Sequence, residues 1–197
     1  MVHHIPNILT IFRIAITPVF IYAFYLPGLV WKIVALLIFI FSTLTDKFDG
    51  FLARRYGWES DLGKYLDPLA DKILITAAFI CLIGYKYIDI WMVAVIVIRD
   101  VFVTWLRSFG IKKGKPVHTM EIARWKTAVQ TIAIYIALVF MIAKVMLKHG
   151  AFIWASLIRA LEEMRFVWIV MLITTLFTLV TGVLYFLENR HLFRVEN

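Results

Sequence analysis

Six long apolar stretches, separated by short polar connections, constrain the fold of this chain more than any other feature. They are Ile8–Leu26, Val30–Leu52, Tyr65–Tyr85, Ile88–Leu106, Ile122–Leu147 and Phe166–Leu187. A helix needs about 20 mostly apolar residues to cross the hydrocarbon core of a bilayer. Because 62% of the 197 residues are hydrophobic, the chain has more apolar surface than a soluble domain of this length can bury. The sequence predicts an all-α integral membrane protein with six transmembrane helices in one bundle, forming a single domain over residues 1–197.

The connections between these stretches carry unequal positive charge. An even number of spans places both termini on one side, together with the loops after the second and fourth stretches. That side holds Arg54, Arg55, Lys64, Lys112, Lys113, Lys115, Arg190 and Arg194. The other side has Lys32 and Lys86 in its short loops, and its longer loop adds Lys148, Arg159 and Arg165. The positive-inside rule therefore predicts a multi-pass protein of the cytoplasmic membrane with both termini in the cytoplasm.

Four aspartates interrupt the apolar pattern where the second stretch ends and the third begins. Asp46 and Asp49 are three residues apart, and Asp67 and Asp71 are four residues apart. On a helix, each pair shares one face. A short connection makes the two helices antiparallel neighbours, so we expect the four carboxylates to converge on one pocket.

The energetic cost of this arrangement favours a metal site. An Asp at the centre of a lipid-exposed helix costs roughly 2.5–3.5 kcal/mol, so four of them would cost about 10 kcal/mol. The aspartates must therefore face an interior cavity or lie near the membrane surface, where divalent cations relieve their repulsion. Mg²⁺ and Mn²⁺ prefer carboxylate oxygen ligands. The alternative is a helix hairpin with capping aspartates and interfacial Arg54 and Arg55, but the regular spacing of the whole set favours metal.

The aspartates are part of a longer motif with fixed spacing. With eight residues between its halves, it reads Asp46-x-x-Asp49-Gly50-x-x-Ala53-Arg54 and Gly63-x-x-x-Asp67-x-x-x-Asp71. This motif resembles the signature of the CDP-alcohol phosphatidyltransferase family at every position. Members of that family have a six-helix membrane domain, are usually dimeric, and use divalent metal to displace CMP from a CDP-linked lipid with an alcohol. The resemblance implies a homodimer that binds CDP-diacylglycerol and two Mg²⁺ or Mn²⁺ ions in a polar cavity at the cytoplasmic side.

The resemblance also implies roles for individual aspartates. Asp46, Asp49 and Asp67 would be metal ligands. Asp71 would complete the metal site and is the candidate general base, because a carboxylate within hydrogen-bond reach of an alcohol can take its proton as the new P–O bond forms.

The CDP-linked donor would be held by a second set of residues. They are Asn7, Thr10, Gly50, Ala53, Arg54 and Gly63. The two glycines and the alanine remove side-chain bulk, and so would make room for the cytidine part of the donor. For Asn7 and Thr10, a role in capping the first helix is equally open.

Shorter segments bear on the identity of the alcohol. Those that resemble bacterial phosphatidylglycerophosphate synthases are Ile5–Arg13, Arg99-Asp100, Leu106-Arg107 and Lys126-Thr127-x-x-Gln130. This resemblance implies sn-glycerol 3-phosphate as the acceptor and a bacterial source. Two departures leave the acceptor open. Asp100 stands where those enzymes usually have Glu, and Ala123-Arg124-Trp125 precedes the lysine where they tend to have Gly-Lys.

An acceptor phosphate needs cationic partners, and three side chains are candidates. Arg99 lies in the middle of a predicted span, where an unpaired guanidinium is expensive. Arg107 and Lys126 lie near the cytoplasmic ends of their helices, where snorkelling to the membrane surface is an equally open explanation. For Arg99 the alternative is an ion pair with an Asp of another helix. Pairing with the adjacent Asp100 is not expected, because neighbouring side chains on a helix diverge.

Other functions remain open from the sequence alone. Within the family, the acceptor could be phosphatidylglycerol (giving cardiolipin), inositol phosphate or serine. Outside it, buried carboxylates can mark a cation or proton transporter, although a transporter would spread them along a path through several helices. A structural scaffold would tolerate Asp67→Asn.

Two further segments have a composition that is typical of regions near a membrane surface. The basic loop Lys112–Lys115 fits a positive-inside determinant, and no nucleic-acid partner is expected. The amphipathic segment Phe152–Met164 is expected to lie along the membrane surface.

Overall fold

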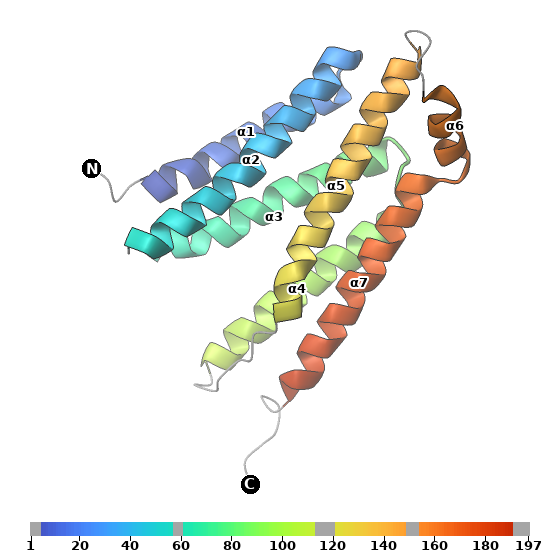
Figure 1. The fold of residues 1–197 in the computed structure, drawn as a ribbon. Coiled ribbons are helices and arrows are strands. Elements are labelled where there is room, and N and C mark those ends of the chain that lie inside the picture. The colour runs from blue at the N-terminus through green and yellow to red at the C-terminus, as the bar shows by residue number, and fades with distance from the viewer. Residues whose placement is uncertain (1–4, 57–60, 113–120, 149–153, 191–197) are drawn as a thin grey trace.

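The computed structural model describes residues 5–56, 61–112, 121–148 and 154–190, and within them the side chains of residues 12–45, 72–110, 125–148 and 154–190. Its helices are α1 (Ile5–Tyr25), α2 (Leu29–Tyr56), α3 (Asp61–Gly84), α4 (Ile90–Lys112), α5 (Glu121–Lys148), α6 (Ala155–Glu163) and α7 (Phe166–Glu188). Over these ranges the chain is helical apart from short turns (Figure 1), which confirms the predicted all-α class.

Each predicted apolar stretch corresponds to one long helix, α1 to α5 or α7. Among the described residues, Trp125–Lys148 of α5 and Phe166–Glu188 of α7 are long and apolar enough to cross a membrane. Large apolar side chains such as Ile98, Ile132 and Ile173 are exposed on the outer faces, as expected of helices that face lipid. The chain thus has membrane-protein character, while the six-span arrangement stays a prediction.

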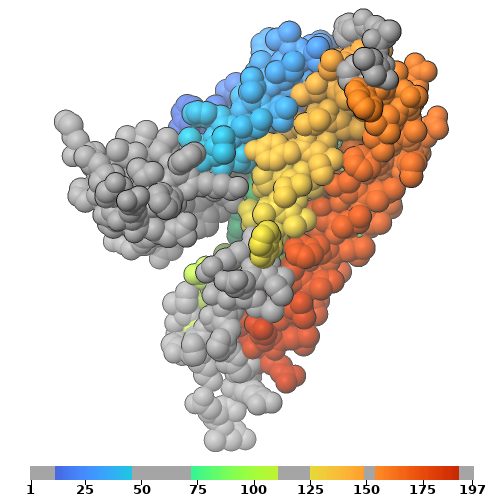
Figure 2. Space-filling model, viewed as in Figure 1, coloured from blue at the N-terminus to red at the C-terminus, as the bar shows by residue number. Residues whose placement is uncertain are grey.

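The long helices pack as two groups that share one core. α1 lies against α2 and α3, α7 lies against α4 and α5, and contacts of α2 and α3 with α5 join the groups. The groups converge at the end where α1 finishes and α7 begins (Figure 1). α5 and α7 lie side by side along one face (Figure 2). Fully buried side chains of the shared core include Phe20, Phe39, Leu82, Leu138 and Met171.

Lys32 is predicted in a short loop, but the structure places it in the first turn of α2, where it is only 2% exposed. Its ammonium group donates to the carbonyl of Phe24 in the last turn of α1 and to the Tyr85 hydroxyl, 2.8 Å away, just after α3. It also lies over the rings of both residues. A cation is stabilised beside carbonyls at a helix C-terminus, which explains why the side chain turns inward rather than toward water.

A stripe of threonines runs along the buried face of α7. Thr174, Thr175, Thr178 and Thr181 are all buried, and Gly182 follows them on the same face. The hydroxyls of Thr174, Thr175 and Thr181 donate to backbone carbonyls three or four residues earlier in α7. These bonds satisfy the hydroxyl donors inside the helix bundle and leave their oxygens available as acceptors.

Candidate active site

The aspartate motif lies on two helices, as its spacing requires. Its first half is in the last third of α2, and its second half is in the first half of α3. Asn7 and Thr10 lie in α1. The side chains of all of these donor and metal candidates, Arg54 included, fall outside the described side chains. Convergence of the four carboxylates therefore stays a prediction. Among the side chains that are described, no three of His, Cys, Asp or Glu are grouped so as to hold a metal ion.

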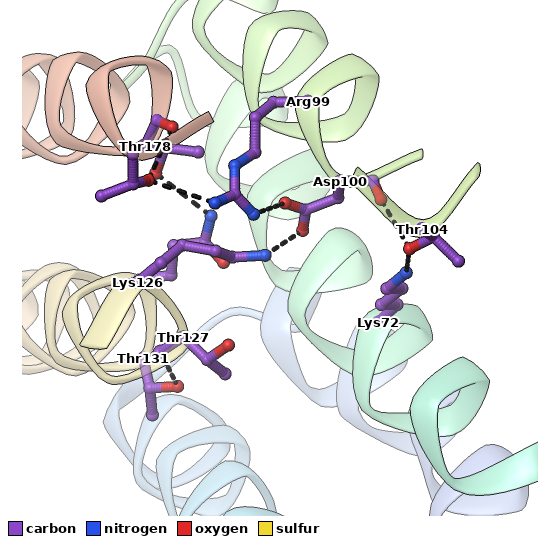
Figure 3. A network of polar contacts seen from close by, with 10 residues as sticks. Lys72, Arg99, Asp100, Thr104, Lys126, Thr127, Thr131 and Thr178 are labelled. Carbon is purple, nitrogen blue, oxygen red and sulfur yellow. Dashed lines mark hydrogen bonds and ion pairs between the residues drawn. The ribbon is translucent and has the colours of Figure 1, made fainter. Parts of the chain in front are cut away.

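The described polar centre of the molecule is an ion-pair cluster between α4 and α5 (Figure 3). Asp100 on α4 accepts from Lys126 on α5 through one carboxylate oxygen, and its other oxygen lies 3.4 Å from Nη1 of Arg99. Arg99 and Lys126 are each only 7% exposed. Because a buried charge is costly unless it is paired, the Asp100 carboxylate acts as the counter-ion that Arg99 and Lys126 share.

The pairing of Arg99 with the adjacent Asp100 corrects the expectation that these neighbours would diverge. The arginine side chain is long enough to bend back along α4, and its surroundings favour that path. On the α7 side, Nη2 donates to the Thr181 hydroxyl at 3.2 Å. A Cβ atom at Gly182 would lie 2.7 Å from Cγ of Arg99, so the glycine provides the space through which the side chain passes. Nε of Arg99 is buried and has no hydrogen-bond partner among the described residues.

The cluster is connected to the helix that carries Asp67 and Asp71. Lys72, the next residue in α3, donates to the Thr104 hydroxyl at 2.6 Å, and Thr104 in turn donates to the backbone carbonyl of Asp100 at 2.7 Å. On the far side, the Gln130 amide on α5 donates to Thr178 of α7 at 3.3 Å. The polar contacts therefore run across α3, α4, α5 and α7.

A cavity of about 180 Å³ opens beside this cluster, between α3, α4 and α5. Its polar lining comes from Lys72, Thr76, Asp100, Lys126, Thr127 and Gln130. Among the described side chains, three cations (Lys72, Arg99 and Lys126) surround the Asp100 carboxylate, which gives these four residues a net charge of +2. In a setting of low dielectric, such an excess attracts an anion far more strongly than it would in water. A phosphate group matches this charge and offers several oxygens to the surrounding donors.

The three predicted phosphate ligands are thus only partly brought together. Arg99 and Lys126 share one counter-ion. Arg107 is exposed, two turns further along α4, and does not line the cavity. Eight residues of helix correspond to about 12 Å. The described geometry therefore supports two of the three as a unit.

Sequence reasoning missed several members of the cluster. From the sequence, Asp100 is set aside as a partner of Arg99, although an acidic residue in the middle of an apolar span is itself a sign of an internal partner. Thr178 and Thr181 were missed because threonine is common in membrane helices. Their spacing on one face of an otherwise apolar helix could have identified them. Nothing in the sequence alone indicated that Lys72 would reach Thr104.

Comparison with known proteins agrees with the motif. The family model for CDP-alcohol phosphatidyltransferase matches residues 3–180. A CDP-diacylglycerol–glycerol-3-phosphate 3-phosphatidyltransferase from Cereibacter sphaeroides is 40% identical over 139 residues, which are 67% of this chain and 62% of that relative. Proteins of the same name from Pectobacterium atrosepticum and Wigglesworthia glossinidia brevipalpis are each 37% identical, over 68% and 67% of this chain and 76% and 75% of their own lengths. The chain belongs to the CDP-alcohol phosphatidyltransferase family.

Proposed function

We propose that the chain transfers a phosphatidyl group from CDP-diacylglycerol to sn-glycerol 3-phosphate, giving phosphatidylglycerophosphate and CMP. The observation that carries this choice of acceptor is the buried cluster in which, among the described side chains, Arg99 and Lys126 share one carboxylate beside a cavity. An acceptor with its own phosphate would supply an anion to these cations. The names of the relatives support the same acceptor. Serine brings no phosphate and would leave the excess charge in place.

The aspartates supply the reacting end of the site. Asp46, Asp49, Asp67 and Asp71 form a set of hard oxygen donors that fits two Mg²⁺ or Mn²⁺ ions. Bound metal would neutralise charge on the diphosphate and on the leaving CMP. In the transfer, the acceptor hydroxyl oxygen forms a bond to the phosphatidyl phosphorus, the bond from that phosphorus to the CMP oxygen breaks, and Asp71 takes the hydroxyl proton.

Helix α3 connects the cavity for the acceptor phosphate with the aspartates at the reacting end of the site. Lys72 lines the cavity and directly follows Asp71 in the sequence. An acceptor whose phosphate occupies the cavity would therefore lie beside the helix that carries the candidate base. Its phosphate would be oriented by Lys126 and Arg99, which frees its hydroxyl to face the aspartates. Arg107 would act at the entrance, as a surface charge that attracts the acceptor, rather than as a ligand.

The donor and the membrane arrangement complete the proposal. CDP-diacylglycerol would be held by Asn7, Thr10, Gly50, Ala53, Arg54 and Gly63. Residues 1–197 would form one six-span domain of a homodimer in the cytoplasmic membrane, with the active site facing the cytoplasm. The apolar outer faces of the described helices and the charge distribution of the loops support this arrangement.

The test is an assay of the purified protein in detergent with CDP-diacylglycerol, Mg²⁺ or Mn²⁺, and one alcohol at a time. We expect CMP release with sn-glycerol 3-phosphate, a phosphatidylglycerophosphate product by mass spectrometry, and loss of both on chelation of the metal. Asp67→Asn is the matched inactive control. Release with serine, inositol phosphate or phosphatidylglycerol alone would reassign the acceptor. Absence of release with every alcohol would contradict the enzymatic proposal.

A further inference from the structure

A second polar cavity lies at the end of the bundle opposite the aspartate motif. It also measures about 180 Å³, and it lies between the α3–α4 turn, α5, α6 and the start of α7. The lining residues that matter chemically are Lys86, Tyr87, Lys144, Glu162, Arg165 and Trp168. α3 continues from Asp71 to Gly84 before it reaches this end. Thirteen residues of helix correspond to about 20 Å, so the cavity is separate from the proposed active site.

The lining of this cavity carries an excess of positive charge. Lys86, Lys144 and Arg165 face one carboxylate, Glu162, which pairs with Lys144. The net charge of these lining residues is therefore +2. The Lys144 ammonium group also lies 5.5 Å from the centre of the Tyr87 ring. The Arg165 guanidinium lies 5.3 Å from the centre of the Trp168 ring. The aromatic rings hold the cations in position without neutralising them.

Tyr87 adds a hydrogen-bond donor to the same cavity. Burial, together with smaller contributions from the nearby Glu162 and Tyr85, raises the pKa of Tyr87 to about 12. The hydroxyl therefore stays protonated at any physiological pH and can donate to an anion. The Trp168 indole is already committed, because its N–H donates to Asp89 at 2.8 Å.

Two of the cations occupy strained backbone positions. Lys86 and Arg165 have φ angles of 58° and 53°, and they are the only described residues other than glycine with positive φ. The left-handed conformation is strained for a residue with a Cβ, and such residues cluster at functional sites. Glycine would adopt it freely. Instead, the chain places a long cationic side chain at each of these positions, and both line the same cavity.

The surroundings of the cavity place it at the level of a membrane surface. α5 ends at Lys148 and α7 begins at Phe166, on either side of α6, and both contain described segments long and apolar enough to cross a membrane. Trp154, Leu157 and Met164, in and beside α6, are 58%, 47% and 66% exposed. Apolar side chains at this level would contact acyl chains, while the cavity faces the headgroups.

We propose that this cavity binds the phosphate of an anionic phospholipid on the membrane side opposite the aspartate motif. Lys86, Lys144 and Arg165 supply the charge, the Tyr87 hydroxyl donates a hydrogen bond, and the exposed apolar residues around α6 contact the acyl chains. A phosphatidylcholine headgroup carries its own cation, which the excess charge of the cavity disfavours. This inference stands apart from the proposed transfer reaction and does not depend on it.

The test measures lipid binding to the detergent-purified full chain by native mass spectrometry, with phosphatidylglycerol and phosphatidylcholine as probes. The informative variants are Lys86→Gly and Arg165→Gly. Each variant removes a cation and introduces glycine, which adopts the left-handed backbone conformation freely, so we expect the fold to be preserved. A cation at an anionic membrane surface contributes about 1 kcal/mol, which is about fivefold in affinity. We expect each variant to lose about fivefold in phosphatidylglycerol affinity and to leave phosphatidylcholine binding unchanged.

Two controls separate a defined site from diffuse surface charge. Arg159→Gln removes an exposed cation from α6 that does not line the cavity, and it should leave phosphatidylglycerol affinity unchanged. Arg165→Lys keeps the charge and should retain most of the binding. Equal losses in Arg159→Gln and the two glycine variants, or no loss in the glycine variants, would overturn the proposal.

A final arm distinguishes lipid from free phosphate and does not depend on the glycine variants. Phosphatidylglycerol that carries a spin label near the headgroup should quench tryptophan fluorescence of the unmodified chain, and Trp168→Phe should reduce that quenching. Inorganic phosphate should compete weakly, because it makes no apolar contacts. Full displacement of the lipid by inorganic phosphate at equal concentration, or unchanged quenching in Trp168→Phe, would refute a lipid site.

Discussion

Replacement of Asp100 by asparagine tests the central cluster most directly. Asp100→Asn keeps the shape of the side chain and one acceptor oxygen, but it removes the only carboxylate that the described structure places against Arg99 and Lys126. Both cations would remain in place, each 7% exposed. The expected result is therefore a loss of stability rather than a local adjustment.

The magnitude follows from the burial of the three groups. Removal of one partner from a buried ion pair costs about 3–5 kcal/mol. The Asp100 side chain is 14% exposed, so some solvent screening remains, and we expect a value near the lower limit, about 3 kcal/mol. For a chain of this size, about 1 kcal/mol corresponds to roughly 2–4 °C in Tm. Asp100→Asn should therefore lower Tm by about 6–12 °C.

The assay is thermal unfolding of the detergent-purified protein, arranged as a double-mutant cycle. Lys126→Met removes the second partner, and the double variant Asp100→Asn/Lys126→Met leaves fewer unpaired charges than Asp100→Asn alone. We expect the double variant to be more stable than the sum of the single effects predicts, by about 1–3 kcal/mol. Asp89→Asn is the matched control, because its partner Trp168 can still donate to the amide oxygen.

Strictly additive effects of Asp100→Asn and Lys126→Met would refute the reasoning, since they would show that the two side chains do not stabilise one another. The same conclusion would follow if Asp100→Asn and Asp89→Asn lowered Tm equally. In either case the excess charge beside the cavity would no longer explain the choice of a phosphorylated acceptor.

Four further variants have expected outcomes. Gly182→Ala places a methyl group against Arg99 and should reduce the unfolding free energy by about 1–3 kcal/mol in the same thermal assay; an unchanged Tm would contradict the close approach. In steady-state kinetics, Lys126→Gln should raise the KM for sn-glycerol 3-phosphate about tenfold or more, the loss of one charged hydrogen bond, and should leave the KM for CDP-diacylglycerol unchanged. Arg107→Gln should have a smaller effect, and equal changes in both variants would argue against the distinction drawn between them. Asp71→Asn should nearly abolish CMP release while Tm is retained, and near-normal turnover would remove Asp71 as the base.

Much of the helical organisation could be predicted from the sequence because it depends on composition and length. Each of the six apolar stretches corresponds to one long helix, and the spacing of the aspartates placed them on α2 and α3. The sequence also grouped Arg99 with Lys126 as candidates for one phosphate pocket, and the structure brings both side chains to Asp100. The convergence of the four aspartates stays a prediction.

The details that failed were those set by tertiary packing. The Arg99–Asp100 pair depends on the space above Gly182 in α7, which lies more than eighty residues away in the chain. The loop-charge count predicts Lys32 beside a short loop, near the start of the second apolar stretch, yet the Phe24 carbonyl at the end of α1 and the Tyr85 hydroxyl draw it inward. Local rules of helix geometry and loop charge contain neither of these distant partners.

The burial of Lys32 has a consequence for biogenesis. In the proposed six-span arrangement, α1 and α2 would enter the membrane during synthesis before Tyr85, just after α3, is available. Until then, the ammonium group has the Phe24 carbonyl but lacks one of the two acceptors that it contacts in the folded chain. The first helical hairpin is therefore an incomplete insertion unit, and we expect a truncation before α3 to leave Lys32 accessible to amine-reactive labels. Arrival of Tyr85 would protect it, so labelling of Lys32 reports the stage at which the first three helices assemble.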